Sequence, residues 1–434
     1  MANPQEKPVV LCVDDEKIVL DSLSEQLRKH LGDSYSYEFA ESAEEAMEVI
    51  QELADEGIHV ALVISDQVMP GMLGDEFLTK LHQHSPDTVK ILLTGQAALE
   101  SAINAVNNAD LFRYLTKPWK KEDFLLTVER GLDRYFLQQQ REKQVECFRK
   151  FVPMEFTEIL SRESLADIEL GECVKRDMSV LFIDIRGFDN LLQQMSPQES
   201  FQFLNGYFKR IEPSIRKAGG FVDKYIGDAV MAVFHETAKA VQAVSDVKQT
   251  VKEYNQQRHS KGRQPICVSM GIHTGPLMLG IVGVESRMQS TVIADAVNLA
   301  SRLEGAAKIF GATALVSQKV LDEVCVANRP EGMQTRFLGK VQVKGRQEVV
   351  RIHELLLRDE DAATNAKINT KTEFEDALQR YFAKDFNGCI HIFESILQQT
   401  KADQATQYYL QRAQHFAQHP PSDSWQGIEM LTVK

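Results

Sequence analysis

Two apolar segments, each with an aspartate at a turn, constrain the fold of this chain more than any other feature. Residues 178–191 read MSVLFIDIRGFDNL, with an apolar run that ends at Asp184. Residues 221–234 read FVDKYIGDAVMAVF, with a Gly-Asp pair between two short apolar runs. Because such a pair between strand-like runs is a hairpin signal, the pattern predicts strand, helix and hairpin. Pairing of these strands would bring Asp184 and Asp228 to one sheet edge, where carboxylate oxygens suit magnesium.

The composition of the chain narrows its class. Its 434 residues allow two or three domains. A formal net charge of −13 disfavours binding to nucleic acid or to an anionic membrane. The six cysteines show no paired metal-ligand spacing, as expected of a reduced cytoplasmic protein. No apolar run approaches the roughly 18 residues of a membrane span, so we expect none.

The first region, residues 7–130, has the rhythm of an α/β domain. Strand-like apolar runs at 9–13, 60–64, 91–93 and 111–115 alternate with helical patterns such as 42–54. This alternation predicts a doubly wound parallel sheet. In such sheets functional residues gather at the carboxyl ends of the strands. The residues that follow these runs are Asp14, Asp15, Asp66, Thr94 and Lys117.

This set, with DQVMPG at residues 66–71, resembles the receiver domain of response regulators, a flavodoxin-like fold. Three crowded carboxylates repel one another unless a cation neutralises them. The resemblance implies one magnesium ion held by Asp15, Asp66 and the backbone carbonyl of Val68, with Asp14 in support. It also implies that Asp66, activated by the metal and by Lys117, accepts a phosphoryl group. The donor would be a histidine kinase or a phosphotransfer protein.

The same resemblance implies a switch pair, Thr94 and Tyr114. The threonine hydroxyl would move toward the phosphoryl oxygens and the tyrosine ring would turn inward. The trigger is the added charge of about −1.5 to −2. A receiver that folds but no longer accepts phosphate is the alternative, and the presence of the acidic pair, acceptor, threonine and lysine disfavours it.

Residues 131–177 are predicted to be a helical connector. Apolar residues at 125, 128, 132 and 135 have helical spacing, which would pack one face on a partner. The stripe is too short to predict a coiled coil. We expect this helix either to transmit a conformational change from the first domain to the next or to serve only as a linker.

A second domain is expected at residues 178–357. Ser196 and Glu199 form a capping box with Pro197 at the first helical position, which predicts a helix start. Further strands are expected at 266–272 and 277–282, a helix at 296–309, and a closing hairpin of 336–343 with 349–356. Strands with helices on one face make an α+β domain.

Residues 174–357 resemble the class III nucleotide cyclases, whose catalytic domain is ferredoxin-like. The resemblance implies that Asp184, Asp228 and the carbonyl of Ile185 bind two magnesium ions, with manganese as the alternative. Backbone amides around Gly187 and Phe188 would hold the terminal phosphates of a nucleotide.

The remaining cyclase positions concern the nucleotide itself. Lys224 and Thr291 match the two purine-reading positions; lysine favours adenine, and threonine departs from the more common aspartate. Asn298 and Arg302 lie four residues apart on one helix face. By resemblance, Asn298 orients the ribose and Arg302 stabilises charge on the α-phosphate. Lys344 is a weaker candidate for contact with the triphosphate.

Together these matches predict an adenylate cyclase that converts ATP to cyclic AMP and pyrophosphate by in-line displacement with two metal ions. In the family each active site lies between two subunits, so one chain with both residue sets predicts a head-to-tail homodimer with two sites. The alternatives are a guanylate cyclase and a non-enzymatic nucleotide-binding adaptor.

Residues 358–434 are predicted to be a linker and a helical tail. The segment 359–371 is polar and linker-like, and two helical stripes follow at 374–382 and 386–397. They resemble one tetratricopeptide-like pair, which cannot bury its own apolar face. We therefore expect the pair to dock on the second domain or on the dimer mate. Pro420, Pro421 and Trp425 suggest an ordered end.

Overall fold

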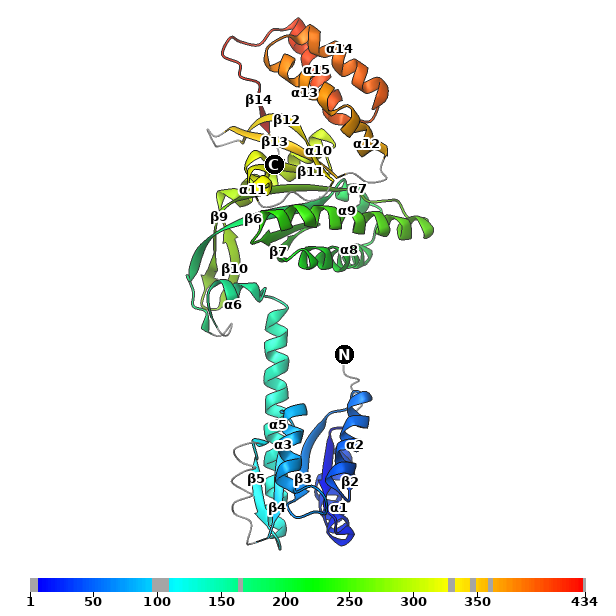
Figure 1. Ribbon diagram of the computed structural model, residues 1–434, viewed down its shortest axis with the longest axis vertical. Coiled ribbons are helices and arrows are strands. Elements are labelled where there is room, and N and C mark those ends of the chain that lie inside the picture. Colours follow the sequence, from blue (N-terminus) through cyan, green and yellow to red (C-terminus); the bar gives the residue numbers. More distant parts are fainter. Residues whose placement is uncertain are drawn as a thin grey trace. The chain divides into compact units, whose positions relative to one another are not determined.

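The computed structural model describes residues 7–95, 109–162, 167–326, 332–343, 349–357 and 362–431. It divides into two compact units, residues 1–150 and 151–434 (Figure 1). Within the described ranges, no helix combines the length and the apolar character needed to cross a bilayer.

The first unit contains a five-stranded parallel sheet. Its strand order is β2-β1-β3-β4-β5, which is the flavodoxin-like order. The predicted doubly wound sheet is therefore confirmed. Strand β2 was not predicted, because its sequence, SYEFA, contains no continuous apolar run. The strands are β1 (Val9–Val13), β2 (Ser36–Ala40), β3 (Val60–Asp66), β4 (Val89–Thr94) and β5 (Arg113–Thr116).

Helices cover both faces of this sheet. Leu23 of α1 and Phe124 of α5 pack on one face, and Ala46 of α2 and Phe77 of α3 pack on the other. Strands β1 and β3 are buried along their whole length for this reason. The helices are α1 (Lys17–Leu31), the 3₁₀ turn η1 (Gly32–Ser34), α2 (Ala43–Asp55), α3 (Gly74–His84) and α5 (Lys121–Arg149).

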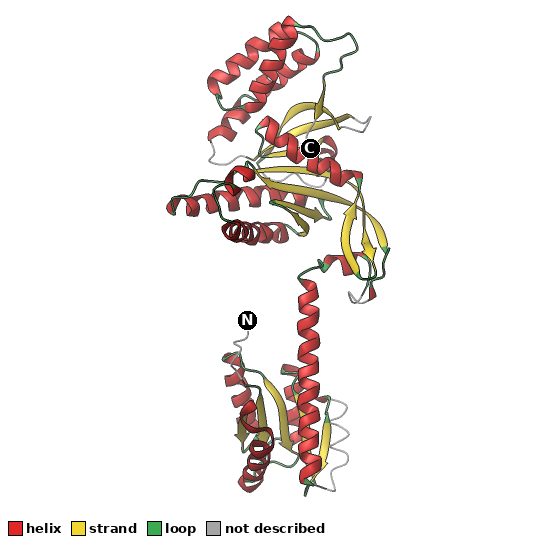
Figure 2. Ribbon diagram, turned by 180° about the vertical axis from the view of Figure 1, so that it is seen from behind, coloured by secondary structure: helices red, strands yellow, loops and turns green. Residues whose placement is uncertain are grey.

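Helix α5 is one continuous helix of 29 residues that extends beyond the sheet (Figure 2). Its first half buries Val128 and Leu132 in the first unit. Farther along, Leu137 and Phe148 are exposed. The boundary expected at residue 131 therefore falls inside a helix, because the apolar stripe stops but the helical backbone does not.

The second unit contains a mixed nine-stranded sheet, so the predicted α+β class is confirmed. The order is β14-β12-β13-β11-β9-β6-β8-β7, and β10 pairs with β9. Most neighbours are antiparallel; β11 with β9 and β12 with β14 are parallel. The strands are β6 (Cys173–Ile185), β7 (Gly220–Ile226), β8 (Ala229–Phe234), β9 (Val268–Val284), β10 (Arg287–Ile293), β11 (Ala314–Ser317), β12 (Met333–Val343), β13 (Val349–Leu357) and β14 (Ile428–Leu431).

The predicted start of this domain at residue 178 falls inside β6. The strand begins at Cys173, and its first residues pair with β9, Cys173 opposite Gly280 and Asp177 opposite Pro276. Residues 173–177 read CVKRD and are largely exposed, so an apolar pattern could not reveal them. The connector is also not helical throughout, since only the short helix α6 (Glu155–Ile159) is described between α5 and β6.

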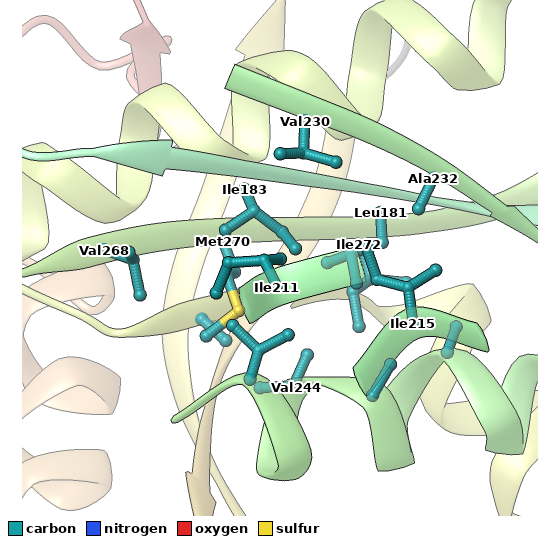
Figure 3. Packing of buried hydrophobic residues seen from close by; sticks show 14 of the residues in the cluster. Leu181, Ile183, Ile211, Ile215, Val230, Ala232, Val244, Val268, Met270 and Ile272 are labelled. Carbon is teal, nitrogen blue, oxygen red and sulfur yellow. The ribbon is translucent and has the colours of Figure 1, made fainter. Parts of the chain in front are cut away.

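The two faces of this sheet carry different layers. Leu181 and Ile183 of β6 pack against Ile211 of α8 and Val244 of α9 (Figure 3). Phe182, which alternates to the other face, packs with a second cluster that includes Ala300 of α10. The expected capping box at Ser196 and Glu199 is formed. The helices are α7 (Phe188–Leu192), α8 (Pro197–Lys217), α9 (Thr237–Ser260), α10 (Asp295–Phe310) and α11 (Gln318–Val326).

The tail is larger than the single predicted helical pair. Its helices are α12 (Ala362–Asn369), α13 (Lys371–Phe382), α14 (Phe386–Gln399) and α15 (Gln404–Gln418). Helix α12 occupies most of the segment expected to be a linker. Helix α15 was missed because its buried positions include small and polar residues such as Ala405 and Thr406.

The tail packs on the sheet domain, one of the two expected docking surfaces. Phe310 of α10 meets the rings of Tyr408 and Tyr409 of α15. The fully buried Arg336 of β12 lies 2.6 Å from Glu354 of β13 and 2.6 Å from Asp403, the residue before α15. Because each buried charge has a partner, this network fixes the tail to the sheet.

Candidate functional sites

An acidic cluster forms at the carboxyl ends of β1 and β3 in the first unit. One ligand atom from each of Asp14, Asp15 and Asp66 lies within 4.8 Å of the others. Asp14 and Asp66 are buried, and Asp15 is exposed. The Nζ atom of Lys117 is 2.6 Å from Asp14 Oδ2 and 2.6 Å from Asp66 Oδ1. Three carboxylates against one ammonium leave negative charge that a divalent cation would balance, so the donor set fits magnesium.

The pKa shifts in this cluster follow from burial and pairing. Burial raises the pKa of Asp14, and the hydrogen bond from Lys117 opposes that rise. Burial alone would lower the pKa of Lys117, but the hydrogen bonds to Asp14 and Asp66 outweigh it and raise that pKa. Lys117 is therefore held charged between two carboxylates.

The other predicted receiver residues surround this cluster. The amide of Val68 donates to Asp66 Oδ2 at 3.2 Å. Thr94 is buried at the end of β4, and its hydroxyl donates to the carbonyl of Gly95 at 3.2 Å. Tyr114 of β5 is exposed. The ring thus lies outward, where an inward turn would change the surface of the unit.

A second carboxylate pair lies in the second unit. Asp184 is near the end of β6, and Asp228 is in the turn between β7 and β8. The amide of Ile185 donates to Asp184 Oδ1 at 2.9 Å and to Asp228 Oδ2 at 3.2 Å, so one N–H group holds both side chains. Burial, then the hydrogen bond and repulsion from Asp184, raise the pKa of Asp228 to about 7. A divalent cation would relieve this repulsion, so the pair fits a metal site.

Lys308, a residue that sequence reasoning missed, contacts this pair. It lies in the last turn of α10, and its Nζ atom forms an ion pair with Asp184 Oδ2 and lies 3.2 Å from Glu304 Oε1. Burial would lower the pKa of Lys308, but its two carboxylate partners raise it. The sequence signal was the i,i+4 spacing of Glu304 and Lys308, which is equally typical of a surface helix pair.

The predicted phosphate-binding residues follow β6 directly. Gly187 has φ +66°, a conformation that favours glycine. Phe188 is buried, and its ring stacks on Phe203 at 6.1 Å. Only its backbone is therefore available to a ligand. Lys344 lies outside the described residues.

The two predicted purine-reading residues are in direct contact. Lys224 of β7 donates from Nζ to Thr291 Oγ1 of β10 at 2.8 Å, although the residues are 67 positions apart. Within the described ranges, no hydrogen bond or ion pair joins either residue to Asp184 or Asp228. The chain therefore holds two separate groups of predicted site residues.

Asn298 and Arg302 lie on α10, as predicted. Asn298 is exposed and Arg302 is half-buried, whereas Leu299 and Leu303 on the same helix are buried in the core shared with the tail. The helix therefore presents a polar side away from its packed faces.

Two modules follow from these observations: a flavodoxin-like domain with an acidic cluster and a lysine, and an α+β domain with a carboxylate pair and a lysine-threonine contact. Residues 10–129 match the family model of the response regulator receiver domain. Residues 173–355 match the model of the adenylate and guanylate cyclase catalytic domain. The chain thus joins a receiver domain to a class III cyclase domain.

The chain is similar to several known proteins. An adenylate cyclase of Anabaena cylindrica is 39% identical over 220 residues, which are 49% of this chain and 43% of that protein. A terminal-differentiation specific adenylate cyclase of Dictyostelium discoideum is 30% identical over 267 residues, 61% of this chain and 12% of that protein. The chain thus spans less than half the length of these curated relatives. Among solved structures, the adenylyl cyclase CyaB from P. aeruginosa is 31% identical, with a TM-score of 0.38 over 44% of this chain and 98% of that chain.

Proposed function

We propose that the chain is an adenylate cyclase that converts ATP to 3′,5′-cyclic AMP and pyrophosphate. The contact between Lys224 and Thr291 carries this proposal. A lysine ammonium donates hydrogen bonds and accepts none. It can therefore pair with the ring nitrogen N1 of adenine, which is an acceptor, and not with the protonated N1 of guanine. The relatives named as adenylate cyclases support the same choice.

The other site residues have complementary roles in this proposal. Asp184, Asp228 and the carbonyl of Ile185 would bind divalent ions, which supply charge neutralisation at the triphosphate and activate the ribose 3′-hydroxyl. The amides of Gly187 and Phe188 would hold the terminal phosphates. Lys308, a cation beside Asp184, would offset phosphate charge.

Helix α10 would complete the site. Asn298 would orient the ribose, and Arg302 would stabilise negative charge as the 3′-oxygen displaces pyrophosphate from the α-phosphorus. In related phosphoryl transfers such an arginine contributes about 10³ to 10⁵ in rate. Substitution of Arg302 should therefore abolish turnover without unfolding the domain.

The two groups of site residues support a head-to-tail homodimer. One subunit would provide the carboxylates, and the other would provide the purine pair with Asn298 and Arg302. Such a dimer has two equivalent sites, each between subunits.

The receiver domain would regulate this activity. Asp66 is the proposed phosphoryl acceptor, Lys117 and one magnesium ion its activators, and a histidine kinase or phosphotransfer protein its donor. Cyclic AMP production by the wild type and by Asp66→Ala, with and without a small phosphodonor, measures the size and direction of this control.

The proposed activity is tested by comparing ATP and GTP turnover of the purified chain with magnesium or manganese. We expect cyclic AMP as the main product, none from Asp228→Asn, and wild-type rates from Glu253→Gln, a neutralisation at an exposed site on α9. Faster formation of cyclic GMP would replace this assignment with a guanylate cyclase. Nucleotide binding without either product would make the domain a binding module.

A further inference from the structure

Asp223, the residue before Lys224, is a buried carboxylate to which no role has been assigned. Its side chain has no exposed surface. Among the residues that the structure describes, neither of its carboxylate oxygens has a hydrogen-bond partner. Buried polar groups without such partners are rare and costly, so the position calls for an explanation.

A β-bulge explains how Asp223 comes to lie beside Lys224. In the β7–β8 register, Val222 is opposite Ala232 and Lys224 is opposite Met231, so Asp223 is an extra residue without its own partner. In a regular strand, consecutive side chains point to opposite faces. The bulge relaxes this alternation, and the Nζ atom of Lys224 lies 3.3 Å from Asp223 Oδ2.

The ammonium of Lys224 is therefore held from two sides. Asp223 provides a negative charge at 3.3 Å, and Thr291 accepts a hydrogen bond at 2.8 Å. Since an ammonium group has three N–H donors and Thr291 accepts from one of them, donors remain for a ligand. Burial raises the pKa of Asp223, and the charge of Lys224 opposes that rise.

We propose that Asp223 is a positioning residue that sets purine specificity by fixing the ammonium of Lys224 against Thr291. The inference rests on the proposed adenylate cyclase function. It also predicts a restriction on which residues position 224 can accept. A guanine-reading residue at position 224 would have to accept hydrogen bonds, and a carboxylate there would face the buried carboxylate of Asp223. Such like-charge contact would disfavour a guanine-reading carboxylate at this position.

A double-mutant cycle tests the proposal. Its four proteins are the full-length wild type, Asp223→Asn, Lys224→Glu and the double variant. Asp223→Asn keeps the shape and removes the charge, so the KM for ATP should rise about tenfold while kcat changes little. Lys224→Glu alone should lose turnover of both nucleotides. Adding Asp223→Asn should raise its GTP turnover about tenfold or more, because the repulsion is removed.

The matched control is Asp177→Asn in the Lys224→Glu background. Asp177 is an exposed aspartate of β6, so its neutralisation changes the net charge equally but leaves Asp223 in place. No recovery of GTP turnover is expected from it. Where Lys224→Glu does not fold, Lys224→Gln replaces it: the melting temperature should fall and should be restored by Asp223→Asn.

The outcomes separate this inference from the proposed function. An unchanged KM for ATP in Asp223→Asn, or a folded double variant no better with GTP than Lys224→Glu, overturns the role of Asp223. If the wild type makes no cyclic AMP, the proposed activity is wrong. The ATP affinities of the same four proteins, measured by calorimetry, then still report the coupling between Asp223 and Lys224. Additive effects of the two substitutions on ATP affinity would then refute it.

Discussion

The two acidic sites of this chain are built in different ways. In the receiver domain, Asp14 and Asp66 are bridged by Lys117, and these residues lie at the carboxyl ends of three strands of one sheet. In the cyclase domain, Asp184 and Asp228 share a single N–H donor, and their cation, Lys308, comes from a helix that also carries Arg302. The first site has its carboxylates and its lysine in one cluster. The second has its carboxylates in one group and its purine-reading residues in another.

This difference indicates how each site can be controlled. A site complete within one domain needs only a phosphodonor and a metal ion. In the proposed dimer the cyclase site is divided between two subunits, so its activity would depend on how those subunits are placed, and the receiver domain could change that placement. The proposed division of the cyclase site is therefore the feature to test first.

The largest expected effect comes from breaking the two halves of the cyclase site in separate chains. Asp184→Ala and Arg302→Ala should each lose about 10³ or more in turnover. An equal mixture of the two should recover about a quarter of wild-type activity, because half of the dimers carry one intact site of two. Absence of recovery, with subunit exchange confirmed by mass spectrometry of tagged chains, would contradict the divided site.

The receiver domain provides the control for this experiment. Asp66→Asn and Lys117→Ala affect one cluster within a single chain, so mixing them should restore no phosphorylation of Asp66 by a small phosphodonor. Recovery of phosphorylation in the mixture would show that one chain can complete the receiver site of another. The receiver site and the cyclase site would then not differ in this respect.

The receiver cluster could be predicted from the sequence because its residues lie at the carboxyl ends of strands. Asp14, Asp66 and Lys117 are each adjacent to an apolar run, and the topology of a parallel sheet brings such positions to one edge. The carboxylate pair of the cyclase domain was predictable for a similar reason. The closing hairpin and the parallel sheet also agree with the structure.

Other features depend on tertiary contacts that no local pattern encodes. Lys308 has the spacing of a surface ion pair with Glu304, and only the packing of α10 brings it to Asp184. Asp223 is buried beside Lys224 because of a register shift that the sequence does not signal. The start of β6 and helix α15 were hidden by polar or small residues at positions that pair or pack.

A smaller effect is expected from removing the cation of the divided site. Lys308→Met would leave Asp184 without its ammonium partner and the triphosphate with less positive charge nearby. We expect the KM for ATP to rise about tenfold, with Lys308→Arg close to wild type. The matched change Lys319→Met, a lysine of α11 with no role in the proposal, should leave KM unchanged. A normal KM in Lys308→Met would make the contact with Asp184 incidental.

The smallest expected effect is the pH dependence of stability and metal affinity in the cyclase domain. It concerns Asp184 and Asp228, which accept hydrogen bonds from one amide, whereas Lys117 bridges the receiver pair. The pKa of Asp228 is raised to about 7 in the folded, metal-free domain. Between about pH 4 and pH 7 this carboxyl group is therefore protonated in the folded domain and ionised in the unfolded chain. The unfolding free energy of the metal-free protein should therefore fall as pH rises from about 4 to 7. Metal binding needs the deprotonated pair, so manganese affinity should rise over pH 6 to 7 by less than tenfold and level off above pH 8. Calorimetric titration of the wild type and Asp228→Asn checks both trends, and a pH-independent affinity in the wild type would show that the pKa of Asp228 is not raised.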